Sequence, residues 1–182
     1  MHQYRIHTIE SAPENSQQAM RTMQQNMGAV PNLAATMAES PVLLNGFLSA
    51  FGNFHGGTLS SAERQVLLLS NAVANGCAWA VAFHSTMALK EGVAAEDVRA
   101  IRERRLPAAE RLAALSRWTR ALIEKRGHVG SSELAEFLAV GFEPHQAFEV
   151  IAGLAVSVQA NYAGNIARPV LEEAFSAQRW EG

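Results

Sequence analysis

Residues 59–92, "LSSAERQVLLLSNAVANGCAWAVAFHSTMALKEG", contain two helical patterns separated by a glycine. Ser60 is followed three residues later by Glu63, a capping box that predicts a helix start. The pattern after it carries apolar residues on several faces, as a helix does when it is buried in a core or between subunits. A second helix is expected to follow Asn75 and Gly76 and to end at Gly92. This helix pair is predicted to form the centre of the fold.

Helix start and stop signals recur along the rest of the chain, whereas strand signals are scarce. Ser11 with Glu14 predicts an N-cap for a helix that reaches about Met27 and stops at Gly28. A short helix is expected after "VPN", ending near residue 40, and "SP" at 40–41 opens another that ends at "HGG", residues 55–57. Further helices are predicted in "AAEDVRAIRE", "PAAERLAALSRWTRALIEKRG", "SSELAEFLAVG" and "PHQAFEVIAGLAVSVQANYAGNI". The fold class expected from these patterns is all-α.

The length and composition are typical of one globular domain spanning residues 1–182. The chain has 182 residues, of which 48% are hydrophobic, so it can bury a core without a disulfide or a structural metal. Its 15 Lys and Arg residues are balanced by 17 Asp and Glu residues, which argues against nucleic acid as a partner. The basic run at residues 102–105 is expected to be a solvated helix end.

The N-terminal residues lack the apolar core of a secretory signal, and no apolar run approaches the roughly 20 residues of a membrane helix. A single unpaired cysteine suits a reducing compartment. We therefore expect a cytoplasmic protein with no membrane partner.

The chain's single cysteine, Cys77, limits the thiol chemistry available to it. In the first turn of the second helix, free N–H groups would favour a thiolate, whereas the alternative is a small buried hydrophobe. Positions 77, 80 and 84 share one helix face, but a rise of about 1.5 Å per residue separates Cys77 from His84 by roughly 10 Å. The residue within reach of both is Ala80.

Residues 59–92 resemble the core of the alkylhydroperoxidase D and carboxymuconolactone decarboxylase superfamily. Its peroxidase branch carries Glu, eleven residues, Cys, two residues, Cys, three residues and His. The preceding "GAVPNLAATMAESPVLLNGFLSAF" also resembles the peroxidase-related members, and the likeness extends over residues 10–165. It implies an alkylhydroperoxidase D-like helical bundle that assembles as a homo-oligomer.

The resemblance also implies site residues, with two departures from the motif. Cys77 and His84 match the first cysteine and the histidine, but Ala80 replaces the second cysteine and Gln65 replaces the glutamate. In the family the second cysteine attacks the peroxide, Glu and His relay a proton, and the first cysteine resolves the sulfenate. Because alanine cannot act as a nucleophile and an intramolecular disulfide needs two cysteines, the two-cysteine cycle is excluded here.

The neighbouring polar residues have structural explanations. Glu63 lies two residues out of register with the motif and is expected to serve the capping box. Gln65 is predicted to hold His84 by a hydrogen bond across the helix pair. Trp79 is expected to pack in the core or at a subunit contact while its N–H finds one acceptor, and His55 and His145 are expected to be exposed. No metal-ligand spacing and no phosphate loop is present, so we expect no metal and no cofactor.

Three functions remain open at this stage. The first is an antioxidant oxidoreductase, either inactive or limited to one-cysteine peroxide reduction at Cys77 with an external thiol reductant. The second is cofactor-independent lactone decarboxylation or related proton transfer with His84 as acid or base. The third is a non-catalytic oligomeric scaffold that binds a small organic molecule.

Overall fold

The structure is a computed structural model that describes residues 4–182. Within this range the chain forms helices and no strand, which confirms the all-α prediction. The helices are α1 (Glu14–Met27), α2 (Asn32–Met37), α3 (Pro41–His55), α4 (Ser61–Ala74), α5 (Ala78–Lys90), α6 (Ala95–Arg102), α7 (Glu110–Glu124), α8 (Ser131–Ala139) and α9 (Pro144–Ala167), followed by a 3₁₀ helix η1 (Glu173–Gln178).

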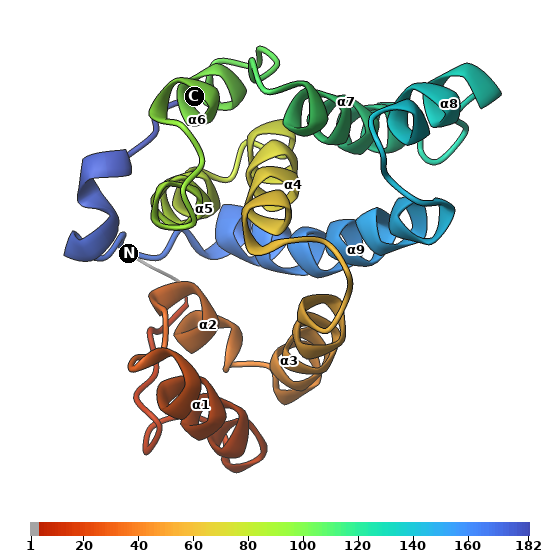
Figure 1. Cartoon of the computed structure of the whole chain (residues 1–182). Coiled ribbons are helices and arrows are strands. Elements are labelled where there is room, and N and C mark those ends of the chain that lie inside the picture. The colour runs from red at the N-terminus through yellow and green to blue at the C-terminus, as the bar shows by residue number, and fades with distance from the viewer. Residues whose placement is uncertain (1–3) are drawn as a thin grey trace.

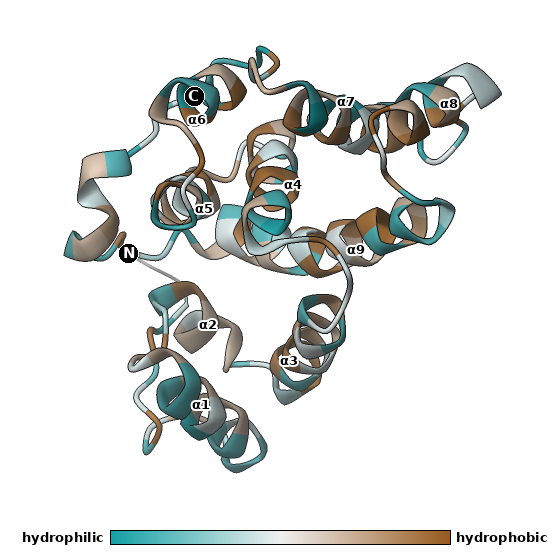
Figure 2. Cartoon of the chain, in the orientation of Figure 1, coloured by the Kyte–Doolittle hydropathy of each residue, from teal (hydrophilic) through white to brown (hydrophobic). Residues whose placement is uncertain are grey.

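Helix α4 lies at the centre of the bundle, as the sequence predicts. It contacts α5, α6, α7 and α9, and its run from Val66 to Val73 is buried. Helices α1, α2 and α3 lie together on one side of α9, whereas α7 and α8 lie beyond α4 on another (Figure 1). Hydrophobic residues are concentrated in α4, α9 and the faces of the helices around them (Figure 2).

Two of the predicted caps are present at the helix starts. Ser40 Oγ accepts a hydrogen bond from the N–H of Leu43 at 3.3 Å and caps α3. Ser60 and Glu63 form the reciprocal capping box of α4, with the Ser60 N–H donating to Glu63 Oε2 at 2.8 Å. Local sequence therefore determines where these two helices begin.

Two other predicted helix starts are wrong. Pro13 is the N-cap residue of α1, and Ser11 instead forms a local turn in which its Oγ accepts from the Thr8 N–H at 2.9 Å. Asn75 caps the C-terminal end of α4, so α5 begins later, at Ala78. Between the two helices Gly76 adopts a φ of 62°, a left-handed turn that glycine allows without strain.

Small residues in α9 allow close contacts between helices, as the sequence predicts. A methyl group at Gly153 would lie 2.8 Å from Leu67 Cδ2 and from Phe54 Cε2. A methyl group at Gly164 would lie 2.8 Å from Cys77 Sγ. The backbone of α9 therefore packs directly against side chains of α3 and α4, and against the residue that precedes α5.

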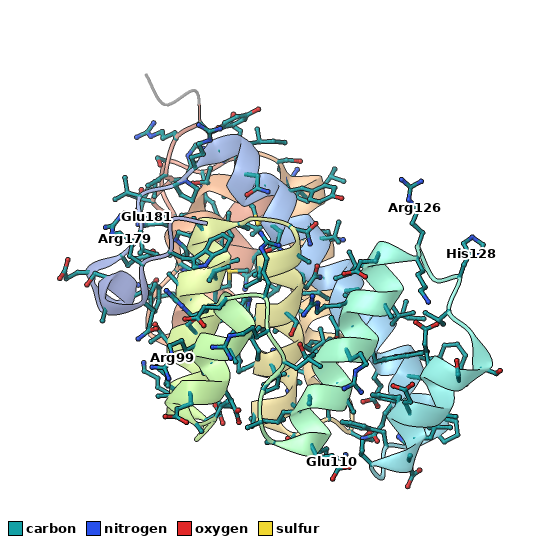
Figure 3. The ribbon with its side chains drawn as sticks, turned by 90° about the horizontal axis from the view of Figure 1, so that it is seen from above. Arg99, Glu110, Arg126, His128, Arg179 and Glu181 are labelled. Carbon is teal, nitrogen blue, oxygen red and sulfur yellow. The ribbon has the colours of Figure 1, made fainter. Side chains whose placement is uncertain are left out.

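The basic run at residues 102–105 is only partly solvated, contrary to the expectation. Arg102 is half-buried and donates to the carbonyl oxygens of Gln178 at 2.8 Å and Arg179 at 2.9 Å. It thereby holds the segment after η1 beside α6, where the chain ends in Figure 1. By contrast, Arg126 and His128, between α7 and α8, extend away from the body (Figure 3).

No helix within residues 4–182 has the length and apolar character needed to cross a membrane.

Candidate functional site

A cavity of about 80 Å³ lies where α1, α2, α3, α4, α5 and α9 meet. Its walls are almost entirely apolar and include the three methionines Met23, Met27 and Met37 and the aromatic residues Phe47, Phe51, Trp79 and Phe83. Ala80 and His84 from α5 also line it, together with Ser157 from α9. This partly open apolar space next to His84 is the candidate functional site.

Gln65 holds His84 across the α4–α5 pair, as predicted. His84 Nδ1 lies 2.9 Å from Gln65 Oε1. An amide oxygen only accepts hydrogen bonds, so Nδ1 must carry the proton and donate it to this bond. The neutral ring then keeps a lone pair on Nε2, which makes no hydrogen bond to another of the described residues. His84 thus presents a hydrogen-bond acceptor at the cavity wall.

Burial keeps the His84 ring uncharged. Removal from water lowers the pKa of His84 to about 3, and the nearby His55 acts in the same direction. The amide of Gln65 carries no charge that could stabilise an imidazolium. At neutral pH His84 is therefore a hydrogen-bond acceptor and a weak base.

His55 is half-buried, so the expectation that it is exposed is wrong. Its ring packs at a tilt of 34° against Phe51 with a centroid separation of 4.1 Å, and its buried Nε2 has no hydrogen-bond partner among the described residues. Burial lowers the pKa of His55, and the positive charge of Arg64 adds to this effect. His145, in contrast, is exposed as predicted.

Cys77 does not line the cavity. It is the N-cap residue of α5, not a residue of the first turn as expected, and its residue exposure is 1%. Its Sγ packs against the bare backbone of Gly164. Burial raises the pKa of the Cys77 thiol, although the N–H groups of Ala80 and Trp79 oppose this effect. Of the three motif positions 77, 80 and 84, the structure brings only 80 and 84 to the cavity.

We expect Cys77 to resist peroxide in the folded protein because the thiolate is both disfavoured and inaccessible. Intact-mass spectrometry after stoichiometric peroxide, with a sulfenic-acid trap, should show no oxygen adduct on the native chain. The same treatment in urea should modify Cys77, which serves as the control for reagent activity. A rapid, trap-sensitive adduct on the folded chain would contradict this prediction.

Glu63 has the structural role that the sequence predicts. Its carboxylate accepts from the Ser60 N–H and, at 2.6 Å, from Arg111 Nε, which joins α4 to α7. Burial raises the pKa of Glu63, but the hydrogen bonds from Ser60 and Arg111 outweigh burial and leave the pKa below its ordinary value. Arg111 also stacks over the Phe142 ring at 3.7 Å. Glu63 therefore caps α4 and joins it to α7.

Glu172 is a residue that the sequence analysis missed. Trp79 Nε1, for which one acceptor was predicted, donates to Glu172 Oε2 at 2.9 Å. The other carboxylate oxygen accepts from the N–H of Asn32 at 2.6 Å, and Asn32 Nδ2 donates to the Val170 carbonyl at 2.9 Å. Glu172 therefore ties together two walls of the cavity, α5 and the start of α2. No local pattern around "VLEEAF" indicates this pairing.

The described residues contain no group of three or more His, Cys, Asp or Glu side chains that could hold a metal ion.

Comparison with known proteins gives one family match and several structural neighbours. Residues 41–121 match the model of the carboxymuconolactone decarboxylase family. No curated protein matches significantly.

Among solved structures, the chain is similar to an uncharacterized peroxidase-related protein from Ralstonia eutropha JMP134 that has an alkylhydroperoxidase D core. The two chains are 18% identical and superpose with a TM-score of 0.83, over 94% of this chain and 93% of the other. A peroxidase-related protein from Silicibacter sp. TM1040 is 14% identical, with a TM-score of 0.79, over 97% and 93% of the two chains. A cysteine-to-alanine variant of the debrominase Bmp8, in complex with 2,3,4-tribromopyrrole, is 21% identical, with a TM-score of 0.77, over 97% and 95%.

Proposed function

Since residues 41–121 match the carboxymuconolactone decarboxylase family model and the chain shares the fold of an alkylhydroperoxidase D core, we propose that it binds a small organic molecule in the cavity beside His84 and is not a thiol peroxidase. One observation carries the proposal. His84 and Ala80 line an apolar cavity from which the chain's single thiol is excluded.

The contacts of Cys77 and Gln65 support this choice over peroxide reduction. An attacking thiol must reach its substrate, whereas Cys77 Sγ packs against Gly164 and is buried. A proton relay needs a group that titrates near neutral pH, whereas Gln65 is an amide and the pKa of His84 is about 3. One-cysteine peroxide chemistry with an external thiol is therefore the less supported reading.

Lactone decarboxylation with His84 is also less well supported. A dicarboxylate substrate requires cationic partners, and no Lys or Arg side chain is among those that line the cavity within the described residues. A neutral imidazole of low pKa is moreover a weak general base at neutral pH. Its free Nε2 is better suited to accepting a hydrogen bond from a ligand.

The debrominase neighbour supports ligand binding without thiol chemistry. That protein has the same fold and is described with a tribrominated pyrrole after one of its cysteines was replaced by alanine. The apolar cavity of about 80 Å³ must widen at its flexible methionine walls to admit such a ring. We therefore use 2,3,4-tribromopyrrole as the probe for the proposed function.

Tribromopyrrole is expected to bind saturably and to quench tryptophan fluorescence, because Trp79 lines the cavity and bromine is a heavy-atom quencher. Ala160 also lines the cavity, so Ala160→Phe should fill it and weaken binding at least tenfold. Ala152→Phe places the same ring at an exposed position of the same helix and should leave binding unchanged.

Two results would contradict the proposal. One is an absence of saturable quenching, or quenching that Ala160→Phe leaves intact. The other is rapid peroxide consumption by the wild-type protein that disappears in Cys77→Ala.

The homo-oligomer expected from the resemblance stays a prediction. Helix α9 provides an apolar stripe on which it could form, because Phe148, Ile151, Tyr162 and Ile166 are exposed along one side of the helix. These positions recur at helical spacing, and contiguous exposed apolar surface is a common feature of subunit contacts.

A further inference from the structure

The surroundings of one polar atom at the cavity wall, His84 Nε2, define a class of ligand. His84 is nine-tenths buried, its Nδ1 is occupied by Gln65, and it lines a cavity whose other walls are almost all apolar. Because Nε2 makes no hydrogen bond within the described residues and His84 lines an apolar cavity, a ligand that donates a hydrogen bond to Nε2 would gain orientation and affinity there. This inference rests on the proposed binding function and names the class of ligand.

The other polar groups at the cavity wall each have a hydrogen-bond partner outside the cavity or within their own helix. The indole N–H of Trp79 is donated to Glu172, outside the cavity. Ser157 Oγ accepts from Asn161 Nδ2 at 3.1 Å, a contact within α9. The cavity therefore offers an acceptor at Nε2 and lacks the array of N–H donors by which proteins bind carboxylates or phosphates.

The charge of the cavity-lining side chains also limits the ligand. None of the side chains from residues 4–182 that line the cavity is ionised at neutral pH, since the only titratable one is His84 and its pKa lies at about 3. Transfer of an anion or a cation into such surroundings is costly without a partner of opposite charge. The ligand must therefore be uncharged.

Size limits the ligand further. The cavity measures about 80 Å³, whereas an engineered apolar cavity of about 150 Å³ accepts benzene. A single ring therefore fits only if the flexible side chains of Met23, Met27 and Met37 move aside and enlarge the space. The aromatic walls formed by Trp79 and Phe83, stacked with a centroid separation of 5.1 Å, favour a flat molecule.

We propose that the cavity selects an uncharged, single-ring compound with one weakly acidic O–H or N–H, which donates a hydrogen bond to His84 Nε2. Apolar contact with the methionine and aromatic walls supplies affinity. The hydrogen bond supplies orientation and discriminates against rings that lack a donor.

Three probes of similar size test the proposal: phenol, which has an O–H; toluene, which has none; and benzoate, which is charged. Calorimetric titration of the wild-type protein should give roughly fivefold tighter binding of phenol than of toluene, since one hydrogen bond is worth about 1 kcal/mol. Benzoate should not bind measurably.

Two variants identify the acceptor. His84→Leu removes Nε2 but keeps an apolar wall, and it should abolish or reverse the preference for phenol, because a buried O–H without an acceptor is costly. Ser157→Ala removes the other polar side chain of the wall and should leave the preference for phenol unchanged. If His84→Leu does not fold, the ¹⁵N resonance of His84 Nε2 in the wild-type protein provides the readout, because it should shift with phenol and not with toluene.

The outcomes separate this inference from the proposed function. Equal affinity for phenol and toluene, a preference that is lost in Ser157→Ala, or tight binding of benzoate would overturn the ligand class while leaving a binding cavity in place. If none of the probes binds, and tribromopyrrole does not bind either, the proposed function itself fails.

Discussion

Acidification from pH 7 to pH 4 is expected to destabilise the folded protein by about 3 kcal/mol through His84 alone. The unfolded chain binds a proton at this imidazole near its ordinary pKa of 6.5, whereas the folded chain binds it only near a pKa of about 3. Between these values the unfolded state holds the additional proton. Acid therefore favours unfolding throughout this window, and stability returns as the pH rises through 6.5.

Urea unfolding measured at intervals between pH 4 and pH 7 tests this expectation. The His84→Asn variant cannot bind the proton, so its stability should depend less steeply on pH, even if it is less stable at pH 7. His128→Asn is the matched control, because the same substitution at an exposed histidine should leave the pH dependence of the wild type intact. Parallel profiles for wild type and His84→Asn would show that His84 is not held neutral by burial.

The second large effect is expected at Gly153, where the backbone of α9 packs against α3 and α4. Gly153→Ala should lower the free energy of unfolding by about 2 kcal/mol, because its methyl group would lie 2.8 Å from Leu67 Cδ2 and from Phe54 Cε2. The helix itself would gain slightly from alanine, so the loss measures overpacking. Chemical denaturation of wild type and variant provides the comparison.

Gly46→Ala is the matched control for this prediction. Gly46 lies inside α3, and a methyl group there would have nothing within 4 Å. The same substitution should therefore raise stability by about 0.5–1 kcal/mol through helix propensity alone. If both variants lost stability equally, close packing at Gly153 would not be the cause.

Much of the helical arrangement could be predicted from local sequence because the relevant interactions are local. The Ser60 and Glu63 capping box joins groups three residues apart, and Gly28 ends α1 with a φ of 78°. The hydrogen bond between Gln65 and His84 could also be predicted, since a short connection places the two helices side by side. Local signals of this kind hold where tertiary contacts do not compete with them.

The predictions for Cys77 and His55 were wrong because their positions depend on the path of the chain between helices or on contacts with residues outside the local pattern. Two residues that favour a helix start, Asn75 and Gly76, instead complete the turn after α4, and this displaces Cys77 from the first turn of α5. His55 occupies a helix end, a place that is usually solvated, but its ring packs against Phe51 and the residue is half-buried. The neighbouring sequence contains no signal for the displacement of Cys77 or for the burial of His55.

The carboxylate of Glu172 has a consequence for the order of folding. Its partners Trp79 and Asn32 lie 93 and 140 residues away along the chain, so these bonds close very long loops. Contacts of such high sequence separation are costly to form before the intervening chain is ordered. The helix pair α4 and α5 can therefore assemble early from near neighbours, whereas the wall that joins α2 to α5 is completed only when residues 170–175 dock, which makes a binding-competent cavity a late product of folding.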